Sequence, residues 1–146
     1  MENLIEKSSN IIDVGCGDGK NSLYLAEHGF KSIDAFDLSE NAVNKLRRLS
    51  ISRQLTINTW VGDLCNFKFT KKYGLIMAFG ILHFISKSDW YNFIINAKCA
   101  TAIGGINIIQ LFTDKVPPSI DIAPYAIGLA ADGEIRECTK TSSFVK

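Results

Sequence analysis

The sequence lacks an excess of charge of either sign. Among its 146 residues, 16 Lys and Arg stand against 15 Asp and Glu, which leaves a formal net charge of +1. Proteins that bind the phosphates of nucleic acids carry a clustered basic surface, and this balance gives no sign of one. We therefore expect a small-molecule partner and no nucleic-acid partner.

The cysteines are widely scattered, and their placement does not fit the common metal motifs. The four cysteines are Cys16, Cys65, Cys99 and Cys138. They form no C-x-x-C pair, and the histidines are not placed to complete a zinc site. We expect reduced thiols, no bound metal and a cytoplasmic protein.

Long hydrophobic runs are absent as well. Residues 1–7 contain no uninterrupted apolar stretch of the kind a signal peptide has, and no later run reaches the roughly 18 apolar residues of a membrane span. No repeat, low-complexity tract or linker divides the chain. Its length suits one hydrophobic core, so we expect a single domain over residues 1–146 with no membrane partner.

Short apolar runs alternate with longer segments of helical period, which is typical of βα units around a parallel sheet. Strands are predicted at residues 10–14, 32–36, 56–61, 74–79 and 106–112, and helices at residues 20–28, 40–52 and 88–101. The third helix is expected to begin at an N-cap of Ser88 or Asp89 and to carry its aromatic and aliphatic residues on one buried side, and a short helix or turn is expected at residues 126–131 and 134–138. Right-handed crossovers give the strand order 3-2-1-4-5. The predicted fold class is α/β, a Rossmann-like doubly wound parallel sheet with its ligand at the switch point between strands one and four.

One loop, directly after the first predicted strand, has glycine at every second position. It reads Asp13-Val14-Gly15-Cys16-Gly17-Asp18-Gly19. Glycine permits positive φ and a close approach of the backbone to a ligand. The dinucleotide pattern G-x-G-x-x-G would need glycine where Lys20 stands, so a NAD-dependent oxidoreductase is the weaker alternative.

The charges around this loop favour a cationic ligand. Asp13 and Asp18 would repel a pyrophosphate but attract the ammonium and sulfonium of S-adenosylmethionine. Asp13 either attracts the methionine ammonium or holds loop amides. Asn21 and Ser22 open the next helix and either bind the amino-acid end of the ligand or satisfy first-turn amides.

Two further acids follow the next two strands. Asp37 comes 18 residues after Gly19, where a carboxylate can accept hydrogen bonds from ribose hydroxyls, and Leu38 beside it can cover the adenine. Asp63 is placed for the adenine amino group, with the Leu64 amide at the ring. The alternative for Asp37 is a cap or turn aspartate, and the alternative for Asp63 is a solvated turn aspartate.

The predicted acceptor pocket opens over residues 78–84, after the fourth strand. Phe79 stands where that strand meets the cofactor, and His83 is the titratable residue of the stretch. His83 is the catalytic candidate, able to bind an oxyanion or relay a proton, with a partly buried core histidine as the alternative. Soft anions and thiolates are already nucleophilic, so their methylation needs no base.

These segments resemble class I S-adenosylmethionine-dependent methyltransferases and, more narrowly, the tellurite-resistance methyltransferase family. The similarity is carried by residues 13–26, Phe36-Asp37, Asp63-Leu64 and Gly104-Gly105-Ile106-Asn107, the last of which falls where the class has the turn before strand five. It implies an enzyme that methylates a small molecule, with tellurite- or selenite-type oxyanions and thiols as candidate acceptors. The cofactor-binding residues that we predict are Asp13, Gly15, Cys16, Gly17, Gly19, Asn21, Ser22, Asp37, Leu38, Asp63, Leu64 and Phe79.

The resemblance stops before the last two strands of the class I fold. Only residues 138–146 remain for them, so these strands are expected to be largely missing, with a stub at residues 142–145. The family residues that hold an oxyanion lie in that distal part and cannot be carried over. The alternative function is an S-adenosylmethionine-binding domain that is catalytically incomplete. Strand five would become an exposed edge, through which we expect either a homodimer or instability.

Overall fold

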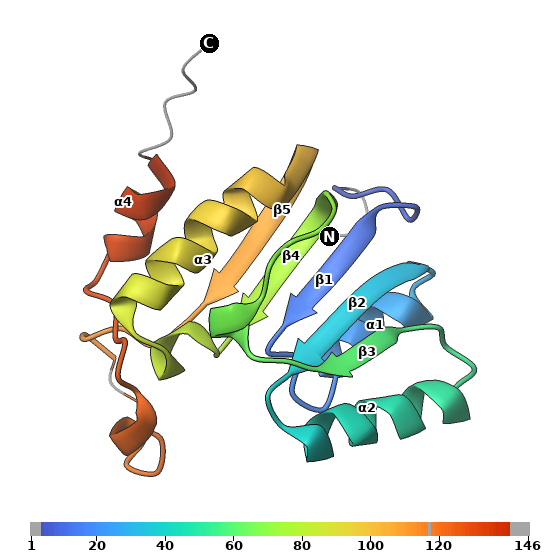
Figure 1. The fold of residues 1–146 in the computed structure, drawn as a ribbon, viewed down its shortest axis with the longest axis horizontal. Coiled ribbons are helices and arrows are strands. Elements are labelled where there is room, and N and C mark those ends of the chain that lie inside the picture. Colours follow the sequence, from blue (N-terminus) through green and yellow to red (C-terminus); the bar gives the residue numbers. More distant parts are fainter. Residues whose placement is uncertain (1–3, 117, 141–146) are drawn as a thin grey trace.

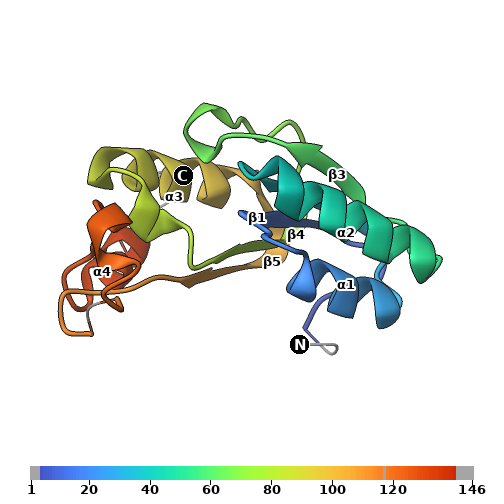
Figure 2. The same cartoon turned by 90° about the horizontal axis from the view of Figure 1, so that it is seen from below.

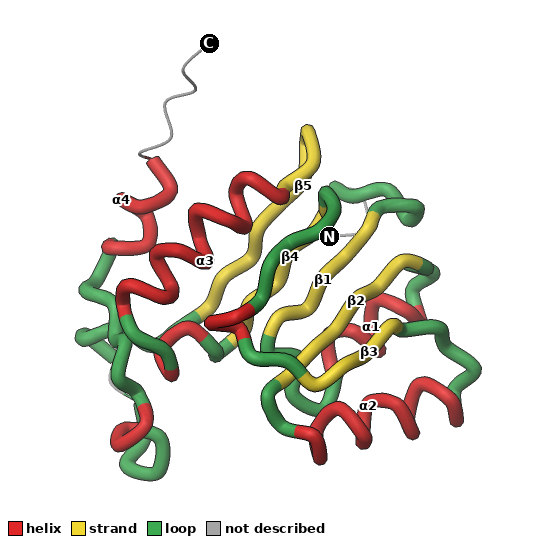
Figure 3. Tube along the Cα trace, viewed as in Figure 1, coloured by secondary structure: helices red, strands yellow, loops and turns green. Residues whose placement is uncertain are grey.

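The computed structural model describes residues 4–116 and 118–140, and a five-stranded sheet with helices on both faces forms its centre (Figures 1 and 2). Figure 3 separates the helices, strands and loops. The strands are β1 (Asn10–Val14), β2 (Ser32–Asp37), β3 (Asn58–Val61), β4 (Tyr73–Phe79) and β5 (Thr101–Gln110). The helices are α1 (Lys20–Glu27), α2 (Glu40–Ser52), α3 (Lys87–Ala100) and α4 (Glu134–Lys140). Three short 3₁₀ turns are η1 (Leu64–Asn66), η2 (Leu82–Phe84) and η3 (Ala123–Tyr125).

The sheet confirms the predicted topology. Its order is β3-β2-β1-β4-β5 and every neighbouring pair is parallel. The central strand β1 pairs with β2 on one side and β4 on the other, so the direction of winding reverses beside β1. In open parallel sheets the crevice at such a reversal, outside the carboxyl ends of the strands, is where ligands bind.

Both faces of the sheet are covered, which explains why the central strands β1, β2 and β4 are buried almost without interruption. Ile11 points to the face covered by α1, and Ile12 points to the face covered by α3. The aromatic and aliphatic residues predicted to share one side of α3 are buried core. Leu46 of α2 packs on Ala35 and on α1, so α2 lies on the same face as α1. Burial on both faces leaves the strand ends and loops as the surface available for a ligand.

Several element boundaries differ from the prediction. Strand β5 begins at Thr101 rather than at residue 106, and its ladder with β4 is interrupted, since Tyr73 pairs with Thr101 and the next pair is Leu75 with Ile106. The turn expected before the strand, at Gly104 with φ 76°, therefore lies inside β5 as an irregularity. Strand β3 begins at residue 58 rather than 56.

The start of α3 also corrects the prediction, which placed the N-cap at Ser88 or Asp89. The cap is Ser86, whose Oγ accepts a hydrogen bond from the Asp89 amide at 3.2 Å. Ser86 Oγ also donates a hydrogen bond to Asp89 Oδ2 at 2.6 Å, so the two side chains together hold the first turn. The first turn thus begins one residue earlier, at Lys87.

After β5 the chain turns back along α3 and η2. The Trp90 indole donates to the Gly128 carbonyl at 3.2 Å, and the Gly128 amide donates to the His83 carbonyl at 3.0 Å. The predicted short helix near residue 134 is present as α4, which is tied to α3 by an ion pair between Glu134 and Lys87. The strand stub predicted at residues 142–145 lies outside the described residues.

Within residues 4–116 and 118–140, no helix has both the length and the apolar composition needed to cross a bilayer. The cytoplasmic location and the single-domain organisation stay predictions.

Candidate functional site

The three glycines of the loop after β1 all have positive φ, at 67°, 54° and 83° for Gly15, Gly17 and Gly19. Their surroundings differ. A Cβ on Gly15 would lie 2.7 Å from the Ile81 side chain, and one on Gly19 would lie 2.2 Å from the Leu46 side chain. A Cβ on Gly17 would meet no protein atom within 4 Å. Two glycines therefore permit close packing, and the middle one leaves its backbone open to a ligand.

Asp37, at the end of β2, holds this loop. Its Oδ2 accepts a hydrogen bond from the Gly17 amide at 2.8 Å, and its Oδ1 accepts one from the Ser39 amide at 2.8 Å. The Asp37 carbonyl accepts from the Gly62 amide at 3.0 Å, which joins the ends of β2 and β3. A carboxylate has about four lone-pair positions, so Asp37 keeps acceptor capacity for a ribose while it supports the loop.

Asp13, the acid at the fourth position of β1, lies beneath the loop. Its side chain is 1% exposed and accepts a hydrogen bond from Ser22 Oγ at 2.7 Å. Burial raises the pKa of Asp13 to about 6, the hydrogen bonds from Ser22 oppose that rise, and the charge of Asp37 adds to it. Asp13 and Ser22 therefore form a buried support for the loop, and the Ser22 hydroxyl points inward. Asn21 is half-buried and faces the groove between α1 and α2.

Cys16 contributes its backbone to the loop and its side chain to the core. The thiol packs against the cluster of Leu23, Ala35 and Leu46. Burial, with the charges of Asp13 and Asp37, raises the pKa of the Cys16 thiol to about 12. The side chain is thus a neutral packing group, and the Cys16 amide donates to the Phe36 carbonyl at 2.9 Å.

The residues predicted for the adenine occupy the ends of β2, β3 and β4. Leu38 is 71% exposed, whereas Leu64 packs against the core on the α3 face and Phe79 packs against the core on the α1 face. Asp63 caps η1, because its oxygens accept from the Cys65 amide and the Asn66 side chain, each at 2.9 Å. Asp63 is thus an exposed aspartate at a turn, as its alternative interpretation had it, and its adenine role stays a prediction.

His83 is more deeply buried than the sequence indicated. Its side chain is 1% exposed, and its ring lies between Phe84 and Phe112, with centroid separations of 4.2 and 4.7 Å. Neither ring nitrogen has a hydrogen-bond partner among the described residues. Burial lowers the pKa of His83, so the ring is neutral at pH 7. An unpaired buried polar group of this kind costs about 1–3 kcal/mol.

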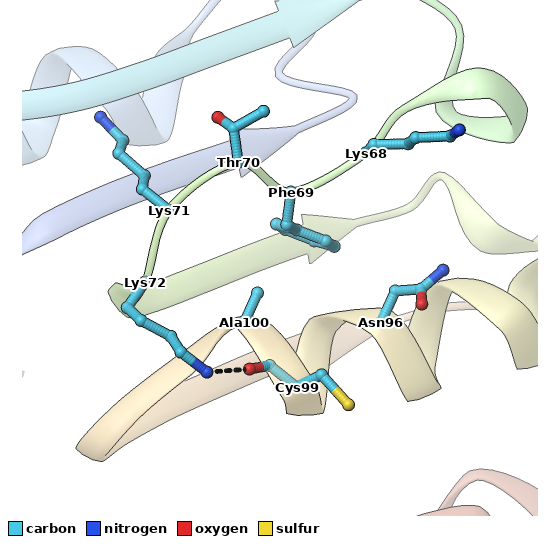
Figure 4. A pocket seen from close by; sticks show the side chains of 8 residues that line it. All are labelled: Lys68, Phe69, Thr70, Lys71, Lys72, Asn96, Cys99 and Ala100. Carbon is cyan, nitrogen blue, oxygen red and sulfur yellow. Dashed lines mark hydrogen bonds between the residues drawn. The ribbon is translucent and has the colours of Figure 1, made fainter.

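Two of the grooves on the molecule run along its helices rather than across the switch point. One, of about 580 Å³, lies between the segment preceding β4 and the last turns of α3 (Figure 4). Its lysines do not converge: Lys72 reaches the Cys99 carbonyl, and Lys71 turns away to Asp34. The other, of about 610 Å³, lies between α1 and α2. Neither brings together the residues predicted for the cofactor.

The parallel sheet, its strand order and the glycine loop at the switch point define a Rossmann-like domain of the class I methyltransferase type. The family model described as "Tellurite resistance protein TehB" matches residues 3–146, and the chain belongs to this family. The family and fold predicted from the sequence are thereby confirmed.

Two curated relatives show the range of the likeness. A probable S-adenosyl-L-methionine-dependent methyltransferase TehB of Haemophilus influenzae is 29% identical over 138 residues, which cover 93% of this chain and 46% of the relative. A 2-heptyl-1-hydroxyquinolin-4(1H)-one methyltransferase of Mycobacteroides abscessus is 30% identical over 144 residues, covering 92% of this chain and 60% of the relative. The chain thus spans about half the length of the first of these relatives.

Two solved structures also resemble this chain. The crystal structure of TehB from Haemophilus influenzae superposes with a TM-score of 0.77 at 29% identity, over 95% of this chain and 48% of that one. Coclaurine N-methyltransferase, crystallised with N-methylheliamine and S-adenosylhomocysteine, gives a TM-score of 0.76 at 14% identity, over 91% of this chain and 43% of that one. The second likeness shows the shared fold alone.

Proposed function

We propose that this chain is an S-adenosylmethionine-dependent methyltransferase that acts on a small molecule. The observation that carries the proposal is the open backbone at Gly17, in a loop that Asp37 holds at the switch point of the sheet. The name of the Haemophilus influenzae relative supports the identity of the methyl donor.

The charges of the loop fit that donor. Asp37, with Asp18 and the buried Asp13, places negative charge around an opening that would receive a sulfonium and an ammonium. In the proposal Asp37 binds the ribose hydroxyls, Leu38 covers the adenine and Asp63 reads its amino group. The bound donor supplies an electrophilic methyl group, and the chain holds donor and acceptor on one axis at near-attack distance.

The acceptor is the finer part of the proposal. Tellurite- and selenite-type oxyanions are suggested by the family name, and thiols are the other candidate. The likeness also extends to a relative named for an organic hydroxyquinolinone. The residues around the end of β4 therefore decide which class of acceptor fits the site.

Calorimetric titration with S-adenosylhomocysteine and, separately, with NADH tests the donor. We expect binding of the first, and Asp37→Ala should remove roughly 1.5–3 kcal/mol of affinity, a weakening of roughly 10- to 150-fold. Asp121→Ala, which changes an exposed aspartate of the segment after β5, is the matched control and should bind as the unchanged chain does. Binding of NADH without binding of S-adenosylhomocysteine would overturn the proposal in favour of an oxidoreductase.

A methyl-release assay on the same protein separates an enzyme from a binding domain. Turnover of an oxyanion or a thiol supports the enzyme. Tight binding of S-adenosylhomocysteine without turnover of any acceptor supports the catalytically incomplete alternative.

A further inference from the structure

The imidazole of His83 carries hydrogen-bonding capacity that the described fold does not use. Its ring is 1% exposed and has two nitrogens without partners among the described residues. Buried polar groups in folded proteins are nearly always paired, and an exception calls for a ligand or a catalytic role. The backbone around the ring is, by contrast, paired, since the Gly128 amide donates to the His83 carbonyl.

The location of His83 connects it to the proposed methyl donor. It lies in η2, directly after the end of β4 and two residues beyond Ile81. Ile81 is the side chain that packs against Gly15, so the η2 turn and the cofactor loop touch. A group held by His83 would therefore stand beside the loop that receives the donor.

The surroundings of His83 are apolar. Phe84 and Phe112 pack against its ring, and burial is the single cause that lowers its pKa, with no charged neighbour contributing. A neutral imidazole offers one donor and one acceptor. It therefore cannot attract an anion by charge, but it can take a proton. Phe84, whose ring packs against that of His83, is itself 37% exposed, so it stands between the imidazole and solvent.

We infer that the methyl acceptor is a neutral thiol or hydroxyl group on an apolar molecule, and that His83 accepts its proton. This inference rests on the proposed function and narrows it, because an oxyanion would need a cation that this part of the site does not offer. Phe84 and Phe112 would contact the apolar body of the acceptor, with the ring of Phe84 turned aside.

The reaction balances without a further reagent. The acceptor oxygen or sulfur forms a bond to the methyl carbon, and the bond between that carbon and the donor sulfur breaks with its electron pair left on sulfur. The proton of the acceptor passes to the unprotonated nitrogen of His83, which becomes imidazolium and then releases the proton to water. General-base assistance of this kind contributes about 10²- to 10⁴-fold.

Methyl transfer to benzyl mercaptan, which is largely un-ionised at pH 7, is compared with transfer to tellurite. We expect kcat/KM for the thiol to exceed that for tellurite by at least about tenfold. His83→Asn should lower kcat for the thiol by about 100-fold or more and remove the loss of activity at acid pH that protonation of His83 causes. His28→Asn, which changes the other histidine of the chain, on the far end of α1, is the matched control and should leave both unchanged.

A second measurement does not depend on turnover. Ring ¹⁵N spectra of histidine-labelled protein, assigned with the same two variants, should show that His83 stays neutral down to below its ordinary pKa. Benzyl mercaptan added with S-adenosylhomocysteine should shift the His83 ring signals and leave those of His28 in place.

These results test the proposed function and the neutral acceptor separately. Failure to bind S-adenosylhomocysteine overturns the proposed function itself. The neutral acceptor is overturned by a preference for tellurite, by a loss of activity at acid pH that persists in His83→Asn, or by His83 ring signals that benzyl mercaptan does not shift. In each of these cases the methyl donor of the proposal is unaffected.

Discussion

We predict that the buried carboxylate of Asp13 lowers the free energy of unfolding and, at the same time, strengthens binding of the methyl donor. Burial raises its pKa from 3.8 to about 6, so ionisation costs more in the folded chain than in the unfolded one. A shift of about two pKa units corresponds to about 3 kcal/mol at 1.36 kcal/mol per unit. This cost is fully present well above pH 6, where Asp13 is ionised in both states.

The sign of the pH dependence follows from proton uptake. Between about pH 4 and pH 6 the folded chain keeps a proton on Asp13 that the unfolded chain has lost. The contribution of Asp13 to the free energy of unfolding therefore falls as pH rises through this window and is constant above it.

Asp13→Asn removes the ionisation and keeps an oxygen that can accept from Ser22 Oγ. We expect the free energy of unfolding to rise by about 1–3 kcal/mol at pH 8 and to change little at pH 4, because the wild-type carboxyl is largely protonated there. Urea unfolding followed by tryptophan fluorescence at both pH values measures the difference. Affinity for S-adenosylhomocysteine should fall, since a negative charge near its ammonium is lost.

Asp18→Asn is the control from the same loop. Asp18 is exposed and pairs with Lys45 at 2.7 Å, which lowers its pKa, so this change should give no gain in stability. An Asp13→Asn variant that is less stable than wild type at pH 8 would refute the reasoning about burial.

Two further predictions concern the loop and the sheet edge. Gly17→Ala should lower stability by about 1 kcal/mol, because Gly17 has a positive φ, and should strongly weaken binding of S-adenosylhomocysteine. Gly19→Ala should lower stability more, because its Cβ would also clash with the Leu46 side chain. Equal thermal unfolding temperatures of the two variants would contradict this. The ten residues of β5 carry no charge, Pro or Lys, and β5 ends the described sheet, so we expect a homodimer through this edge. Sedimentation at micromolar concentration should show the dimer, and Ile103→Lys should disrupt it. A monomeric wild-type chain would contradict dimerisation through β5.

Much of the fold follows from local pattern. Strand β1 matches its predicted bounds because an apolar run is ended by a glycine loop, and the strand order follows from the handedness of the crossovers. The early start of β5 was missed because Gly104 and Gly105 read as a turn. The structure keeps that turn but adds a pairing of Thr101 with Tyr73 before it, and a single long-range pair leaves no local signal.

The candidate site was predictable in position but only partly in detail. The loop, Asp37 and Asp63 could be placed at the strand ends, yet local pattern did not reveal that Asp37 holds the Gly17 amide. The burial of His83 could not be derived, because Phe112 and Gly128, which pack and bond around it, stand far along the chain. No periodicity connects such residues, so only the folded arrangement shows that the ring has no partner.

The proposed site thus has two halves of different electrostatic character. Around Gly17, carboxylates from β1 and β2 favour a cationic donor, whereas around His83 aromatic rings enclose a neutral imidazole. An anionic acceptor entering the second half would lose its hydration without meeting a cation, and a buried unpaired charge is costly. A neutral acceptor avoids that cost, and its reaction with a sulfonium forms positive charge that passes to the imidazole as a proton. The division of charge between the two halves therefore favours a base at His83 over an anion-binding role for the same residue.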